Sequence, residues 1–107
     1  MMTITPEELF DLLKYDITND NQGTITYRFN GEIHRDDDQP AIIFADGSKY
    51  WYQDGKRHRD NDQPATLSLS GFMSWWIYGE RHRDNDQPAV IFASGNKEWW
   101  VNGNRIR

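Results

Sequence analysis

The chain has 107 residues, no cysteine and a net charge of −5. Its length suits about one domain with a modest core, and the lack of cysteine excludes disulfides, thiolate chemistry and cysteine-based zinc sites. Residues 1–23 carry five acids and one lysine, so residues 24–107 are nearly neutral. Without a basic stripe, we expect no nucleic-acid binding through phosphate contacts and no binding to a membrane surface.

No stretch approaches the roughly 18 consecutive apolar residues of a membrane span. The N-terminal segment carries acids where a signal peptide would need basic residues. We therefore expect a cytoplasmic protein that forms a single domain over residues 1–107.

The first expected element is a helix. Thr5 suits the N-cap, Pro6 the first helical position, and Glu8 the acidic position of a capping box. A helix of about 12 residues is unstable alone, so we expect it to pack on, or cap, the chain that follows. The rest of residues 1–22 is predicted to be a turn-rich linker. The apolar stripe that would dock consists of Leu9, Phe10, Leu12, Leu13 and Ile17.

Residues 23–107 repeat with a period of 24. The motif HRD(D/N)DQPA occurs at residues 34–41, 58–65 and 82–89. One column of equivalent positions is always aromatic: Tyr27, Trp51, Trp75 and Trp99. Such a period indicates stacked supersecondary units, each relying on its neighbours to bury its apolar surface. The segment holds about three and a half units.

Each unit is predicted to be a β-hairpin. In the first full unit, two β-favouring runs are separated by Asp46-Gly47, and the second run ends at another glycine turn, Asp54-Gly55. We therefore predict a mainly β fold in which tandem 24-residue hairpins form an elongated antiparallel sheet.

Strand alternation assigns the faces of this sheet. We predict that the aromatic column and the positions equivalent to 41, 43 and 45 form the core face. The intervening positions vary between units and often carry aromatic side chains, which is typical of a contact surface on a repeat scaffold. The alternative that these aromatics only fill cross-strand pairs or lie under the helix stays open. The predicted binding residues are Phe44, Tyr50, Tyr52, Trp76, Phe92 and Trp100, with Arg59 and Arg83 as a polar rim.

The HRD(D/N)DQPA motif is interpreted as the joint between hairpins. Arg59 and Arg83 are followed by acids, so each guanidinium can meet a carboxylate of its own or the adjacent unit. A metal site or a general base formed by His34, His58 and His82 is the competing interpretation. Three equivalent pairs in solvated turns lack the asymmetry of a catalytic site, so we expect no enzyme activity, no metal site and no cofactor.

The stretch FADGSKYWYQDGKRHR resembles the MORN repeat, a β-hairpin unit of similar length, and the likeness recurs over residues 24–107. The chain is also similar to tandem-repeat proteins of bacteriophages, bacteria and large DNA viruses. It departs from MORN where glycine is replaced by Trp51 or Trp75 and by Arg35, Arg59 or Arg83. The resemblance implies a meandering sheet used for protein contacts.

These expectations favour a non-catalytic protein-binding module, such as a small phage-encoded inhibitor of a bacterial host or defence factor. The alternative function is binding or sequestering a nucleotide or sugar by stacking it on Tyr52, Trp76 and Trp100. The exposed strand edges also allow self-association, for which we expect a homodimer through the C-terminal edge.

Overall fold

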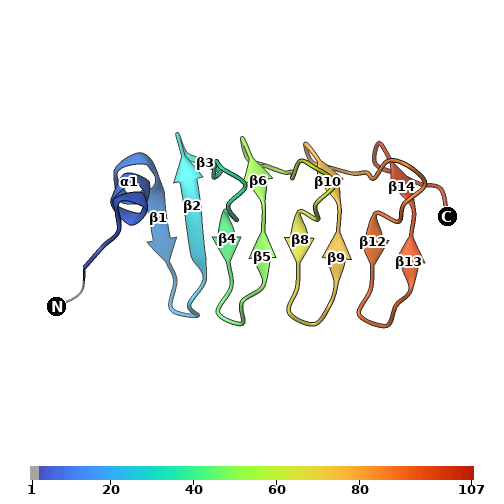
Figure 1. The fold of residues 1–107 in the computed structure, drawn as a ribbon, viewed down its shortest axis with the longest axis horizontal. Helices are drawn as coiled ribbons and strands as arrows, with labels where there is room; N and C mark the ends of the chain where they lie inside the picture. The colour runs from blue at the N-terminus through green and yellow to red at the C-terminus, as the bar shows by residue number, and fades with distance from the viewer. Residues whose placement is uncertain (1–2) are drawn as a thin grey trace.

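The computed structural model describes residues 3–107 (Figure 1). The fold is mainly β, with one short helix, α1 (Pro6–Lys14), beside the first strands. The molecule measures 52 × 27 × 22 Å along its principal axes.

A nine-stranded antiparallel sheet runs along the molecule. Its strands are β1 (Asp16–Asn19), β2 (Ile25–Phe29), β3 (Glu32–Ile33), β4 (Ile42–Ile43), β5 (Lys49–Tyr50), β8 (Thr66–Leu67), β9 (Met73–Ser74), β12 (Val90–Ile91) and β13 (Lys97–Glu98). Neighbouring strands follow the order β1-β2-β4-β5-β8-β9-β12-β13, and β3 pairs with β2. Apart from β3, the strands of this sheet therefore lie side by side in chain order, as Figure 1 shows.

Three small hairpins follow β5, β9 and β13 and lie outside the main sheet. They pair β6 (Tyr52–Gln53) with β7 (Lys56–Arg57), β10 (Trp76–Ile77) with β11 (Glu80–Arg81), and β14 (Trp100–Val101) with β15 (Asn104–Arg105). The sequence predicted one continuous run through residues 49–53, but the strand breaks at Trp51. The backbone N–H of Trp51 donates to the carbonyl of Ala65 at 2.8 Å, after which the chain turns to pair with β7.

Turn chemistry explains where the small hairpins reverse. Asp54 and Gly55 both have positive φ angles, 50° and 79°, which is the type I′ geometry that favours Asp-Gly in two-residue hairpins. The joint between units has two further left-handed residues, Asn61 at 61° and Asp62 at 56°. Asn and Asp tolerate this region better than most residues, which accounts for the alternation of Asp and Asn in the motif.

The core is small and consists mainly of one tryptophan and one alanine from each of successive units. Trp51 and Trp75 are each only 6% exposed, as expected for the aromatic column, and Trp99 and Tyr27 are half-buried. The alanine that each tryptophan meets across the joint is fully buried. The main-chain bond from Trp51 to Ala65 recurs in the next unit from Trp75 to Ala89, also at 2.8 Å.

The face assignment of the remaining strand positions was wrong in part. Leu67 and Leu69 were expected on the core face but are 37% and 72% exposed, whereas the expected outward positions Thr66, Ser74 and Val90 are almost fully buried. Each tryptophan lies at a break between two strands. The inward and outward alternation of side chains is interrupted there, so the face of the tryptophan does not predict the face of positions 43 and 45. Long side chains on the other face, such as Trp76 over Ser74, cover the small residues there.

The helix begins as predicted but docks differently. Thr5 caps it, with the backbone N–H of Glu8 donating to the Thr5 hydroxyl and the Glu8 carboxylate accepting from the Thr5 N–H. None of its residues is buried, and Leu9 and Leu13 are 46% and 79% exposed. The apolar stripe therefore does not dock; the helix is held through polar side chains, which are described below.

The expected linker is partly a strand. Residues 16–19 form β1, in which Ile17 pairs with Tyr27 of β2. The turn that follows is held by the Asp20 carboxylate, which accepts hydrogen bonds from the backbone N–H groups of Gln22 and Thr24. The sequence signal for this strand is weak, because only one of its four residues is apolar.

Candidate binding surface

The strongest candidate site is a row of alternating aromatic and arginine side chains. Tyr50, Tyr52, Trp76 and Trp100, which we call the aromatic face, are all half-buried. Arg57 and Arg81 lie between them, because the hairpin register places Arg57 opposite Tyr52 and Arg81 opposite Trp76.

The guanidinium of Arg57 lies 4.5 Å from the Tyr50 ring centroid and 5.1 Å from that of Trp76. The guanidinium of Arg81 lies 5.2 Å from the Trp76 ring and 5.0 Å from the Trp100 ring. These distances are within the range of cation–π attraction. The aromatic rings and the two cations therefore hold one another in place.

The donors of these two arginines are largely unused. The Nε atoms of Arg57 and Arg81 are buried and have no hydrogen-bond partner within residues 3–107. Arg57 donates one side-chain hydrogen bond, from Nη2 to the Tyr52 hydroxyl at 3.1 Å. A buried donor without a partner costs on the order of 1–3 kcal/mol. The remaining N–H donors of the two guanidinium groups are the ones left for a ligand or a partner.

The predicted polar rim, Arg59 and Arg83, packs on the buried aromatic column. Arg59 and Arg83 belong to a second series, Arg35, Arg59, Arg83 and Arg107, which we call the stacked arginines. Arg59 lies 3.8 Å from the Trp51 ring and Arg83 lies 3.9 Å from the Trp75 ring. Both guanidinium groups therefore pack on the buried aromatic column. The two arginines still lie next to the aromatic face, because the backbone N–H of Arg59 donates to the carbonyl of Trp76 at 3.2 Å and both arginines line one pocket with Trp76.

The stacked arginines already have their hydrogen-bond partners. Arg59 donates from Nε to Asp38 Oδ1 at 2.8 Å, from Nη2 to Asp38 Oδ2 and from Nη1 to the carbonyl of Pro64. Arg83 repeats this pattern with Asp62 and Pro88. Each guanidinium thus meets the carboxylate of the preceding unit, which decides between the two arrangements that the sequence left open. The hydrogen bond from Arg59 lowers the pKa of Asp38, and the bond from Arg83 does the same for the pKa of Asp62.

Phe44 and Phe92 directly follow β4 and β12, next to the turns between the main-sheet strands. Phe44 packs edge-on against Tyr50 at 4.8 Å between centroids, and Phe92 packs against Phe72 at 5.5 Å. Phe92 is 37% exposed. The turns that follow Phe44 and Phe92 lie at the bottom of Figure 1, and Phe92 lines a shallow pocket together with Arg105.

The three histidines form clamps between units. His58 Nδ1 accepts a hydrogen bond from the backbone N–H of Tyr78 at 3.0 Å. Its Nε2 must then carry the proton and donate to Asp60 Oδ1 at 2.8 Å. His34 and His82 make the same pair of bonds. Both ring nitrogens of each histidine are thus occupied.

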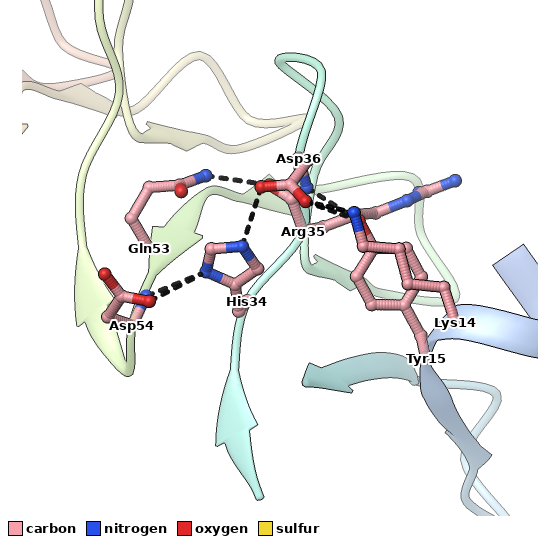
Figure 2. Close-up of polar contacts among 7 residues, drawn as sticks. All are labelled: Lys14, Tyr15, His34, Arg35, Asp36, Gln53 and Asp54. Atoms are coloured by element: carbon pink, nitrogen blue, oxygen red, sulfur yellow. Dashed lines mark hydrogen bonds and ion pairs between the residues drawn. The ribbon is translucent and has the colours of Figure 1, made fainter. Parts of the chain in front are cut away.

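Figure 2 shows the first of these clamps and its junction with the helix. Asp36 accepts from His34 Nε2 at 2.7 Å and pairs with Lys14, and its backbone N–H donates to the Tyr15 hydroxyl at 2.9 Å. The hydrogen bond from Lys14, followed by that from His34, lowers the pKa of Asp36. Arg35 pairs with Asp11 of the helix at 2.7 Å.

Asp11 therefore takes the role that Asp38 has for Arg59 and Asp62 has for Arg83. The helix supplies the carboxylate that a preceding hairpin would supply, so it acts as a polar cap on the first unit. Its side chains pair with Arg35 and Asp36 and reach the ring of Phe29.

An open groove lies beside Arg81. It has a volume of about 460 Å³. Its lining residues are Trp76, Gly79, Glu80, Arg81, Trp100, Asn102 and Gly103. Within residues 3–107, no three His, Asp or Glu side chains converge as metal ligands. The helix in that part of the chain is also too short and too polar to cross a membrane.

The sequence predicted all four residues of the aromatic face as binding residues. It did not predict Arg57 and Arg81, which lie between them. A signal for them was present. The turn at Asp54-Gly55 fixes a two-residue hairpin, and this register puts residue 57 opposite residue 52. The motif arginines carry the stronger repeat signal, because they belong to a longer identical stretch.

Comparisons with known proteins give no further information. The chain matches no protein family, no curated protein and no solved structure.

Proposed function

We propose that this protein is a non-catalytic, MORN-like repeat module that binds a protein partner through the aromatic face. The observation that carries the proposal is the alternation of aromatic and arginine side chains across the three small hairpins, in the order Tyr52, Arg57, Trp76, Arg81 and Trp100. Trp, Tyr and Arg are the residues most enriched at the energetic centres of protein interfaces. The surface is a strip held on a hydrogen-bonded scaffold, which suits an extended contact.

The occupied ring nitrogens of the histidines also support a non-catalytic role. A general base needs a nitrogen within reach of a substrate proton, and His58 uses one nitrogen on Tyr78 and the other on Asp60. The likeness to phage tandem-repeat proteins makes a cytoplasmic bacterial host or defence factor the partner to test first.

The test is capture of a partner from bacterial lysate by the wild-type chain and two variants. Trp76→Ala combined with Trp100→Ala removes the centre of the surface and should weaken binding by about 2 kcal/mol or more, roughly 30-fold in Kd. Leu69→Ala is the matched control, since Leu69 is 72% exposed and lies in the turn between β8 and β9, away from β10. The proposal fails if the same protein is captured equally by all three.

A second function, the binding of a nucleotide or sugar, is favoured by the groove beside Trp76 and Trp100. Native mass spectrometry of the purified protein separates the two functions, because a carried ligand adds a small mass. The same spectrum reports the homodimer that we propose through the edge formed by β13.

A further inference from the structure

A row of equivalent positions runs across the three small hairpins. Arg57, Arg81 and Arg105 occupy it once in each unit, and we call them the arginine row. Backbone bonds fix its spacing, because the N–H of Gly79 donates to the carbonyl of Arg57 at 2.8 Å, and that of Gly103 donates to the carbonyl of Arg81 at 2.9 Å. The three guanidinium groups are thus presented from neighbouring hairpins at a set interval.

Two members of the row lack an anionic partner. Within residues 3–107, neither Arg57 nor Arg81 forms an ion pair, and Arg81 donates no side-chain hydrogen bond. Aromatic rings on both sides orient the planar groups. An oriented guanidinium presents parallel N–H donors that match the two oxygens of a carboxylate.

The third member of the row, Arg105, pairs with a carboxylate. Arg105 Nη1 lies 3.4 Å from Glu98 Oε2, and the other oxygen of Glu98 accepts from the indole N–H of Trp100 at 2.9 Å. The position equivalent to Glu98 is Ser74 in the preceding unit and Tyr50 in the unit before. The chain thus places a carboxylate against the row in the last unit and places none in the other two.

There is room for an external carboxylate at the middle position. The groove of about 460 Å³ beside Trp76 and Trp100 is lined by Arg81. Glu80 is the one acidic residue of its lining, and it forms no ion pair within the described chain. A side chain that entered this groove would reach Arg81 between the two indole rings.

We propose that Arg57 and Arg81 bind carboxylates, and that the protein partner contributes an acidic segment laid along the aromatic face. Successive acidic side chains of that segment approach Arg57 and Arg81 from the solvent side, through the groove in the case of Arg81, and pair with the guanidinium groups as Glu98 pairs with Arg105. This inference rests on the proposed function, since it names the chemistry of the partner that the surface accepts.

The direct test is a titration with hexaglutamate, followed through the side-chain Nε–H signals of the arginines by NMR. The signals of Arg57 and Arg81 should shift, while those of Arg59 and Arg83, which are already bonded to aspartates, should not. Hexaglutamine and inorganic phosphate serve as controls. Equal shifts of all arginines, no shifts, or equal shifts with phosphate at the same concentration would each overturn the carboxylate assignment.

Two variants make the test specific. Arg81→Gln should weaken hexaglutamate binding at least tenfold, with a thermal melt to check folding. Glu98→Ser copies the residue of the preceding unit in the edge strand β13 and removes the ion pair of Arg105 Nη1. The Arg105 Nε–H stays bonded to the Arg107 carbonyl, so the freed Nη groups should bind the peptide and the Arg105 side-chain signal should become the third that responds. An Arg105 signal that stays unresponsive in Glu98→Ser contradicts the inference even where Arg81→Gln fails to fold.

Partner capture distinguishes this inference from the proposed function. If the Trp76 and Trp100 double variant loses the partner while Arg57→Gln with Arg81→Gln keeps it, the aromatic interface stands and the carboxylate row is wrong. If neither variant loses the partner, the proposed interface is wrong, and the hexaglutamate titration still decides whether the row binds carboxylates.

Discussion

Adjacent tryptophans in this chain have opposite roles. Trp75 is buried, its indole N–H donates to the carbonyl of Asp62 at 3.1 Å, and Arg83 stacks on its ring. Trp76, the next residue, is half-buried and lies between Arg57 and Arg81. Successive side chains of an extended chain point to opposite sides, so one indole joins two units while the other faces outward.

The two roles predict different effects on stability. Trp75→Ala should lower the free energy of unfolding by about 3–5 kcal/mol, because it removes a large buried ring and leaves a cavity. Trp76→Ala should cost clearly less, since solvent already reaches its ring. Urea unfolding of both variants measures the difference, and an equal or reversed loss would contradict the roles assigned here.

At the scale of elements, the start of the helix was predicted correctly, but the side chains that attach it to the sheet were not. The capping box formed as expected, yet the contacts to the sheet come from Asp11 and Lys14. A nine-residue helix is unstable alone, so these contacts hold it. Its apolar residues Leu9, Leu12 and Leu13 are exposed.

Asp11→Ala should therefore detach the helix. Loss of its bond to Arg35 removes a charge-assisted hydrogen bond, worth about 1.5–3 kcal/mol, and should abolish hydrogen-exchange protection within residues 6–14. Asp16→Ala is the control, because Asp16 is an exposed aspartate at the start of β1. Protection that survives in Asp11→Ala would mean that other contacts hold the helix.

At the scale of the whole molecule, carboxylates couple each unit to the next. Asp38 and Asp62 each accept bonds from an arginine of the following unit, and these bonds lower their pKa values. The ordinary pKa of aspartate is about 3.9. A carboxylate with a lowered pKa stabilises the folded state above that value and loses its contribution as the pH falls through the lower folded-state pKa.

We expect the free energy of unfolding to fall as the pH drops below about 4. The double variant Asp38→Asn and Asp62→Asn should be less stable at neutral pH and should lose less stability between about pH 4 and pH 2. Urea unfolding across this range provides the measurement. Parallel pH curves for the two proteins would show that these carboxylates do not couple the units.

Much of the candidate surface follows from local pattern. The glycine turns fix the small hairpins, and alternation then identifies Tyr52, Trp76 and Trp100 as neighbours on one side. The burial of Thr66 and Ser74 could not be predicted this way, because small polar residues carry no core signal. Ser74 lies against Trp76, two residues further along the chain, whose indole N–H donates to the Ser74 hydroxyl at 2.8 Å.

The sequence by itself determined the antiparallel β class, the start of the helix, the turn positions and the burial of Trp51 and Trp75. These features depend on backbone preferences and on spacing within a single repeat unit, so short stretches carry their signals. Only the tertiary structure decided which arginines stack on the core, which form ion pairs with aspartates, and which side chains attach the helix to the sheet. Those outcomes depend on side chains from different units meeting across strands, where several partners of the same chemical type compete.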